Sequence, residues 1–294
     1  MTWKPDDAEC RHMLPFNREL TLLHHDLGQY IRQEEAAYVS RHTAPDTLMG
    51  HLERVATHAV RLALKEGVDP LQAELAGLFH DAGKFHGGKY HDDEIPEEEY
   101  SIDVLRTFGG RAGLDPAVVE SVAMAIAQLY QDDVDSTPLS KVLFDADNLD
   151  KLGLTGIALY FIKSGLRGHG FSADMIVRLT VELTYARYAE QCLYTQTARN
   201  IAEQRASDTI DFIRALLETM REDGLFDACV ERVRVCDLDL DVISPSACSC
   251  GEVMELKNWI EKGTKCTEIH LELVCKKCSN RYKIRFCRPR LIAS

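Results

Sequence analysis

The sequence predicts a mainly α-helical protein that ends in a small β module. Apolar residues recur at helical spacing through most of residues 1–240, whereas apolar-polar alternation is evident only after residue 250. Six of the ten cysteines crowd into residues 248–294. A length of 294 residues suits one large domain with a small appended module. We therefore expect an all-α domain over residues 1–240 and a Cys-rich domain over residues 245–294.

N-cap residues, prolines and glycines divide the predicted helical domain into separate helices. Residues 47–66 carry apolar side chains at a 3.6-residue spacing and predict one helix. Asp69 and Pro70 open the next helix as N-cap and first residue, and we expect it to reach His80 and to be terminated by Gly83. Further helices are expected to open at Asp115 and Thr137, each followed by proline, and to span 172–192 and 194–222.

The C-terminal part changes in pattern and in charge. “EIHLELVC” (268–275) and “RYKIRFC” (281–287) alternate as half-buried strands do. Residues 248–294 hold ten Lys/Arg against five Asp/Glu, a net charge of +5, whereas the rest of the chain holds 24 against 42, a net charge of −18. Together with the Pro/Ser break “ISPS”, this shift marks a domain boundary near residue 245.

Composition excludes several classes of protein. The net charge of −13 argues against nucleic-acid binding by the whole chain. No run of 18 apolar residues occurs, and the N-terminal segment lacks the apolar core of a secretory signal. We expect a cytoplasmic protein without membrane contact, whose thiols stay reduced. The sequence does not indicate an oligomeric state.

Four features together indicate a metal site: His51, His80, Asp81 and the cluster “DADNLD” at 145–150. Taken singly, each has a structural explanation, such as a core position for His51. Adjacent helical residues point about 100° apart, but the backbone can unwind near a helix end, so that His80 and Asp81 face one ion. Mixed N/O ligands suit Mn, Fe, Co, Ni, Mg or Zn. Periodicity alone leaves three candidates in the cluster: Asp145, Asp147 and Asp150.

Three segments resemble the H…HD…D signature of the HD-domain metal-dependent phosphohydrolase superfamily: “HLERVATHAVRLA”, “LAGLFHDAGK” and “FDADNLDKLG”. The similarity extends roughly over residues 45–220. It implies a helical bundle in which the metal ligands are His51, His80, Asp81 and Asp147. Asp147 is selected because it occupies the ligand place in the D-A-D-x-L-D motif of a bacterial subgroup.

The sequence departs from the dinuclear members of that superfamily. Their additional histidines are replaced here by Glu97 and Leu129. This departure favours a site for one ion, to which Glu97 remains a possible oxygen donor.

The resemblance implies hydrolysis of a phosphomonoester or phosphodiester, in a nucleotide or other small metabolite, through metal-activated water. Asp81 would also accept a proton, and Lys84 would neutralise phosphate charge, unless it is an ordinary surface lysine. Arg199 and Arg205 would bind phosphate, unless they pair with acidic residues. Two alternatives stay open: a non-catalytic regulatory protein that binds nucleotide or metal, and a nucleic-acid-processing hydrolase whose C-terminal module reads the nucleic acid.

The C-terminal cysteines predict a zinc-ribbon-like module. A C-x-C pair and a C-x-x-C pair, with 24 residues between them, offer four thiolates to a structural zinc ion: Cys248, Cys250, Cys275 and Cys278. Zinc would substitute for the core that so small a module lacks. Cys266, Cys287 and His270 leave an alternative choice of ligands open. With a net charge of +5 beside −18, we expect the module to dock on its own chain.

Overall fold

A computed structural model describes residues 18–38, 47–88, 95–129, 136–166, 169–248, 250–262 and 266–292. The contacts within the chain form two compact units. The first comprises Met1–Thr57 and Asp69–Leu143, and the second comprises His58–Val68 and Phe144–Ser294. The first unit is helical, whereas the second combines helices with strands.

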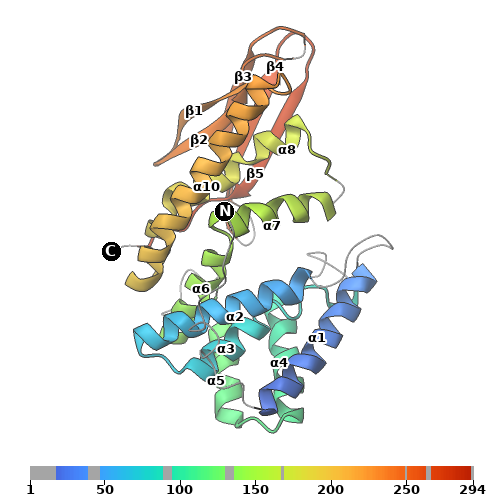
Figure 1. The fold of residues 1–294 in the computed structure, drawn as a ribbon, viewed down its shortest axis with the longest axis vertical. Coiled ribbons are helices and arrows are strands. Elements are labelled where there is room, and N and C mark those ends of the chain that lie inside the picture. Colours follow the sequence, from blue (N-terminus) through green and yellow to red (C-terminus); the bar gives the residue numbers. More distant parts are fainter. Residues whose placement is uncertain are drawn as a thin grey trace, which may run out of the picture. The chain divides into compact units, whose positions relative to one another are not determined.

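The N-terminal half of the chain forms helices that follow the predicted caps (Figure 1). Asp69 accepts a hydrogen bond from the Gln72 N–H at 3.0 Å, and Asp115 accepts one from the Ala117 N–H at 2.9 Å. Both aspartates are therefore N-caps, as the sequence predicts. The helices are α1 (Arg18–Tyr38), α2 (Thr47–Glu66), α3 (Pro70–Phe79), the short η2 (His86–Gly88), α4 (Glu97–Arg111), α5 (Pro116–Ala127) and α6 (Pro138–Asp150).

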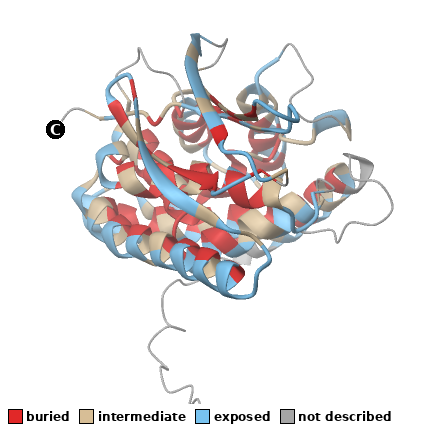
Figure 2. Cartoon of the chain, turned by 90° about the horizontal axis from the view of Figure 1, so that it is seen from above, coloured by how far each residue is buried: buried red, intermediate tan, exposed pale blue. Residues whose placement is uncertain are grey.

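Most of the helices bury one side and expose the other (Figure 2). In the first unit, α3 is an exception: its last seven residues are all buried. The largest fully buried side chains of this unit include Leu27, Ile31, Leu52, Leu75, Leu78, Phe79, Leu105 and Ile126. Burial on all sides thus fixes the end of α3, which is followed directly by the predicted ligands His80 and Asp81.

The second unit contains four further α-helices, one short 3₁₀ helix and all the described strands. The helix expected at 172–192 is divided into three pieces, and Ser172 caps the first through the Met175 N–H. The helices are α7 (Gly153–Leu166), α8 (Ala173–Arg178), α9 (Thr180–Tyr188), the short η3 (Glu190–Cys192) and α10 (Gln196–Glu222).

Two antiparallel sheets follow α10. The predicted strands at 268–275 and 281–287 are confirmed as β4 (Thr267–Cys275) and β5 (Arg281–Cys287), which form one sheet with β3 (Met254–Lys262) in the order β3-β4-β5. A separate hairpin pairs β1 (Ala228–Val235) with β2 (Leu238–Pro245). The expectation of an all-α segment up to residue 240 is therefore wrong from residue 228 onward. The alternation in “CVERVRV” and “LDLDV” is the signal that identifies this hairpin.

The three-stranded sheet shares its core with other elements of its unit. Its buried face joins side chains of the hairpin and of helices α8 and α9 in one cluster, and Tyr185 donates a hydrogen bond to the Cys287 carbonyl at 2.9 Å. The cluster contains Val177, Tyr188, Val235, Leu238, Leu240, Val242, Met254, Ile269, Leu271, Leu273, Ile284 and Phe286. Apolar burial thus holds the sheet against helices of its own unit. Among the described helices, none is both long enough and apolar enough to cross a bilayer.

Candidate functional site

Helices α2 and α3 approach closely at a glycine. A Cβ added to Gly77 would overlap the backbone of Ala56 in α2. Only glycine allows this contact, which brings the buried His51 of α2 and His80 of α3 together with their ring centroids 5.2 Å apart. The glycine three residues before the histidine is a sequence signal for this close approach.

The end of α3 orients the two adjacent predicted ligands. α3 ends at Phe79, and His80 is its C-cap. The Nδ1 atom of His80 lies 2.9 Å from the Gly77 carbonyl oxygen, so Nδ1–H donates and Nε2 keeps its lone pair. A metal-binding histidine is typically fixed by such a second hydrogen bond.

The three side chains His51, His80 and Asp81 form one compact group. The Oδ2 atom of Asp81 lies 3.8 Å from Nε2 of His51 and 3.9 Å from Nε2 of His80. Ligand atoms held about 2.0–2.2 Å from one ion are spaced roughly 3.0–3.5 Å apart. A shift of less than about 1 Å would therefore close this group around an ion. The donor set and its burial fit a divalent metal.

Gly83 and Lys84 follow the predicted ligands and contact their surroundings. Gly83 was expected to terminate the helix, but the helix has already ended at Phe79. Gly83 serves close packing instead: a Cβ there would overlap the backbone at Tyr100 and Ser101, and its N–H donates to the Ser101 hydroxyl at 3.0 Å. Lys84 forms an ion pair with Asp81.

Helix α6 presents the “DADNLD” carboxylates within the second unit. The Asp145 carboxylate is fully buried and accepts hydrogen bonds from the Tyr194 N–H, the Thr195 N–H and the Thr195 hydroxyl at 2.7–2.8 Å. Burial raises the pKa of Asp145 to about 6. Asp147 is also buried, and Lys151 contacts it at 2.7 Å. Lys151 was not predicted, although its i,i+4 spacing from Asp147 is the signal that finds it.

The two arginines predicted to bind phosphate are both engaged by backbone carbonyls. Arg199 donates to the Leu193 carbonyl at 2.9 Å, and Arg205 donates to the Leu149 carbonyl at 2.6 Å. Arg205 also lies 3.3 Å from Nε2 of His58. These bonds hold the start of α10 and the end of α6, and the phosphate-binding role of the two arginines stays a prediction.

Four cysteines meet in the second unit. The Sγ atoms of Cys248 and Cys278 are 3.4 Å apart, and those of Cys250 and Cys275 are 3.5 Å apart. All four lie within 4.8 Å of one another, which approaches the spacing of about 3.8 Å expected for thiolates around zinc. Backbone N–H groups, first that of Cys278, lower the pKa of the Cys275 thiol and favour its thiolate form.

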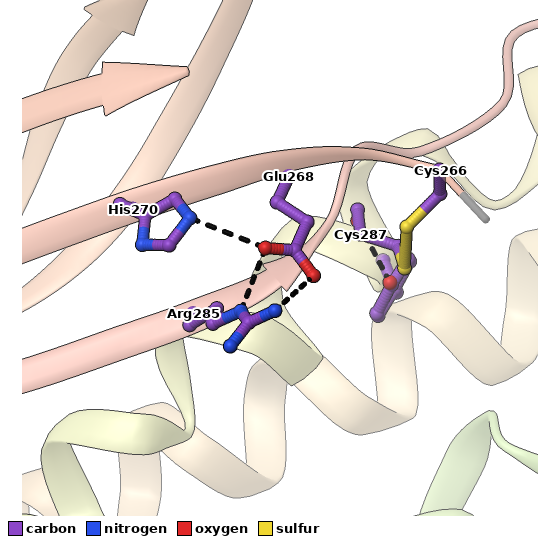
Figure 3. Close-up of a disulfide and its surroundings, with 6 residues drawn as sticks. Cys266, Glu268, His270, Arg285 and Cys287 are labelled. Atoms are coloured by element: carbon purple, nitrogen blue, oxygen red, sulfur yellow. Dashed lines mark hydrogen bonds and ion pairs between the residues drawn. A yellow bond between two sulfur atoms is a disulfide. The ribbon is translucent and has the colours of Figure 1, made fainter. Parts of the chain in front are cut away.

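The remaining two cysteines of this region form a disulfide, Cys266–Cys287 (Figure 3). The expectation of reduced thiols is therefore wrong for this pair. The disulfide joins the start of β4 to the end of β5 and removes Cys266 and Cys287 from the possible zinc ligands.

Comparison with known proteins is consistent with this geometry. The profile of the HD domain matches residues 48–152, a range that contains His51, His80, Asp81 and Asp147. The uncharacterized protein YpgQ of Bacillus subtilis (strain 168) is 31% identical over 176 residues, which cover 56% of this chain and 80% of YpgQ. The putative phosphohydrolase YueE of the same organism is 27% identical over 117 residues, which cover 35% of this chain and 65% of YueE.

Solved structures share the fold. The crystal structure of B. subtilis YpgQ superposes with a TM-score of 0.51 at 26% identity, covering 69% of this chain and 97% of that one. A crystal structure of YpgQ in complex with ADP superposes with a TM-score of 0.50 at 24% identity, covering 67% and 97%.

Proposed function

The chain belongs to the HD-domain superfamily of hydrolases, and on that premise we propose that it is a metal-dependent phosphohydrolase acting on a phosphomonoester or phosphodiester. The observation that carries this proposal is the convergence of His51, His80 and Asp81 at the buried end of α3. Imidazole and carboxylate donors of this kind bind divalent first-row metals, which phosphoester hydrolysis uses.

The metal is held by His51, His80, Asp81 and Asp147 in this proposal. Support for Asp147 comes from its place in the family motif and from its burial in α6. Asp145 is disfavoured because three hydrogen bonds already occupy its carboxylate. A divalent ion bound here would activate a water molecule and polarise a phosphoryl oxygen.

The protein side chains orient the reaction. The hydrogen bond from His80 to Gly77 keeps Nε2 directed toward Asp81. Asp81 accepts the proton of the attacking water, and Lys84, its ion-pair partner, donates to the phosphate as negative charge develops there.

We further propose that the substrate is a nucleotide. The support is the relative YpgQ, which has been crystallised in complex with ADP.

The C-terminal cysteines bind a structural zinc ion in this proposal. Support comes from the converging Sγ atoms of the four cysteines named above. Zinc would join the turn at Cys248 to the turn at Cys275 and so close one end of the sheet.

The test combines metal analysis with activity. Purified protein with its native metal is assayed against nucleoside mono-, di- and triphosphates and cyclic dinucleotides, together with His80→Gln and Asp147→Asn. Both variants should lose HD-site metal and at least about 100-fold in kcat/KM. His25→Gln is the control, since His25 is an exposed histidine of α1 that contacts Gln29. Equal metal and activity in all four proteins would contradict the assignment.

A further inference from the structure

The exposed face of the three-stranded sheet carries a second group of metal-ligand side chains. The strand register places Glu261 of β3 directly opposite Glu268 of β4. His270 follows two residues after Glu268, on the same face, with Trp259 opposite it on β3 and Arg285 opposite it on β5. Glu261, Glu268 and His270 are called the outer-face cluster below.

The ligand atoms of the outer-face cluster converge on one point. The Nε2 atom of His270 lies 3.3 Å from Oε2 of Glu261 and 3.3 Å from Oε2 of Glu268. This nitrogen is shielded from solvent, and among the described residues it makes no contact with hydrogen-bond geometry. Both carboxylates therefore approach the ring nitrogen at the spacing of neighbouring ligands around one ion.

Neighbouring side chains hold two of the ligands in place. The Trp259 ring stacks on the His270 ring, with centroids 5.1 Å apart and planes inclined by 15°. Arg285 donates two hydrogen bonds to Glu268, both at 2.7 Å, and Figure 3 shows Glu268 between His270 and Arg285. Supporting contacts of this kind orient metal ligands and tune their affinity.

The two negative charges of the outer-face cluster favour the binding of a cation. Glutamates directly opposite each other across a sheet destabilise it, because like charges repel at short distance. Arg285 neutralises Glu268, and the ion-pair partner of Glu261 in the described part of the chain is His270, which carries a positive charge only when it is protonated. Glu261 is 64% exposed, so an ion can enter from solvent on that side.

We propose that Glu261, Glu268 and His270 bind a divalent transition-metal ion. One imidazole and two carboxylates favour Zn²⁺, Co²⁺, Ni²⁺ or Mn²⁺. The ion links the edge strand β3 to β4 in addition to their backbone hydrogen bonds, and it offsets the repulsion between the two glutamates. This site is separate from the Cys248, Cys250, Cys275 and Cys278 group and does not rest on the hydrolase assignment.

Trp259 provides a local reporter for the test. The chain has two tryptophans, so Trp3→Phe leaves Trp259 as the only indole. The full-length Trp3→Phe protein, kept free of reductant and dialysed to remove exchangeable metal, is titrated with CoCl₂ while tryptophan fluorescence is recorded. Co²⁺ bound at His270 should quench the stacked Trp259 in a saturable manner, and excess ZnCl₂ should restore the emission by displacing it.

Variants in the Trp3→Phe background locate the quenching ion. His270→Phe keeps a ring against Trp259 but removes the nitrogen ligand, so the saturable quenching should disappear. Glu261→Gln and Arg285→Met should each weaken cobalt binding by about tenfold or more. Glu272→Gln is the matched control, because Glu272 lies on the same face and contacts Arg281 and Lys283; its titration should be unchanged. The proposal is overturned if Trp3→Phe shows no saturable quenching, or if His270→Phe retains it.

Discussion

The Nδ1 atom of His80 lies 2.9 Å from the carbonyl oxygen of Gly77, three residues earlier in the same helix. This hydrogen bond sets the tautomer of the imidazole and turns Nε2 toward Asp81. Gly77 also lets α3 approach the Ala56 backbone of α2. One glycine therefore positions both His80 and the helix that carries His51.

Gly77→Ala should damage stability and metal binding together. Its Cβ would overlap the Ala56 backbone, and we expect overpacking to cost about 1–3 kcal/mol despite the better helix propensity of alanine. Urea denaturation measures the free energy of unfolding, and isothermal titration with Mn²⁺ measures the metal affinity, which should fall.

The control is Gly110→Ala in α4. Among the described residues, no atom outside its own helix lies within 4 Å of the position of the new Cβ. This substitution should stabilise the protein by about 0.5–1 kcal/mol. Equal stability of the two variants would show that the α2–α3 approach does not depend on Gly77.

Asp145→Asn should weaken the hydrogen-bonded contact between α6 and the residues that precede α10. The amide keeps one acceptor oxygen but turns an NH₂ group toward backbone donors, so at least one of the three hydrogen bonds is lost. We expect a loss of about 2–3 kcal/mol in the free energy of unfolding. Asp211→Asn, an exposed position on α10, should change it by less than about 0.5 kcal/mol. If the two variants lose equal stability, the hydrogen bonds of Asp145 make no net contribution to the free energy of unfolding.

Cys275→Ser should release the structural zinc ion. The expected content falls by one zinc per chain, and thermal unfolding measured by far-UV circular dichroism should begin at a lower temperature because one end of the sheet loses its closure. Cys236→Ser is the control: Cys236 is exposed in the β1–β2 turn and lies outside the four-cysteine group. Retention of the full zinc content by Cys275→Ser would exclude this group as the zinc site.

Local patterns account for what the sequence predicts correctly. The helix at 47–66 and the strands β4 and β5 match their predictions because their periodicity is strong and their ends carry clear signals. The mainly helical fold with a C-terminal β module is confirmed, and His51, His80 and Asp81 lie together as the family resemblance implies.

What the sequence does not predict depends on pairing between distant segments. Strand β3 is mostly exposed and lacks clean alternation, so the position of Glu261 opposite Glu268 cannot be read from the sequence. The disulfide between Cys266 and Cys287 depends in the same way on the register of β4 and β5, which places Cys287 opposite Glu268. The division of residues 172–192 into α8, α9 and η3 likewise follows from tertiary packing, which overrides helical periodicity.

Glu182→Gln should make stability less dependent on pH. Burial raises the pKa of Glu182 to about 7 from an ordinary value of 4.5, against the opposing charges of Lys163 and Lys151. Between these two values the folded protein binds a proton that the unfolded chain releases. The resulting stability is fully present below about pH 4.5 and is lost as the pH rises through 7.

Glutamine cannot ionise, so at high pH the variant keeps the stability that the wild type loses when Glu182 ionises. The free energy of unfolding of Glu182→Gln minus that of the wild type should therefore be about 2–3 kcal/mol larger at pH 8 than at pH 5. Urea midpoints at the two pH values measure this difference. Glu222→Gln, an exposed position at the end of α10, should shift both midpoints equally. Parallel pH profiles for the wild type and Glu182→Gln would show that Glu182 ionises at the same pH in the folded and unfolded states.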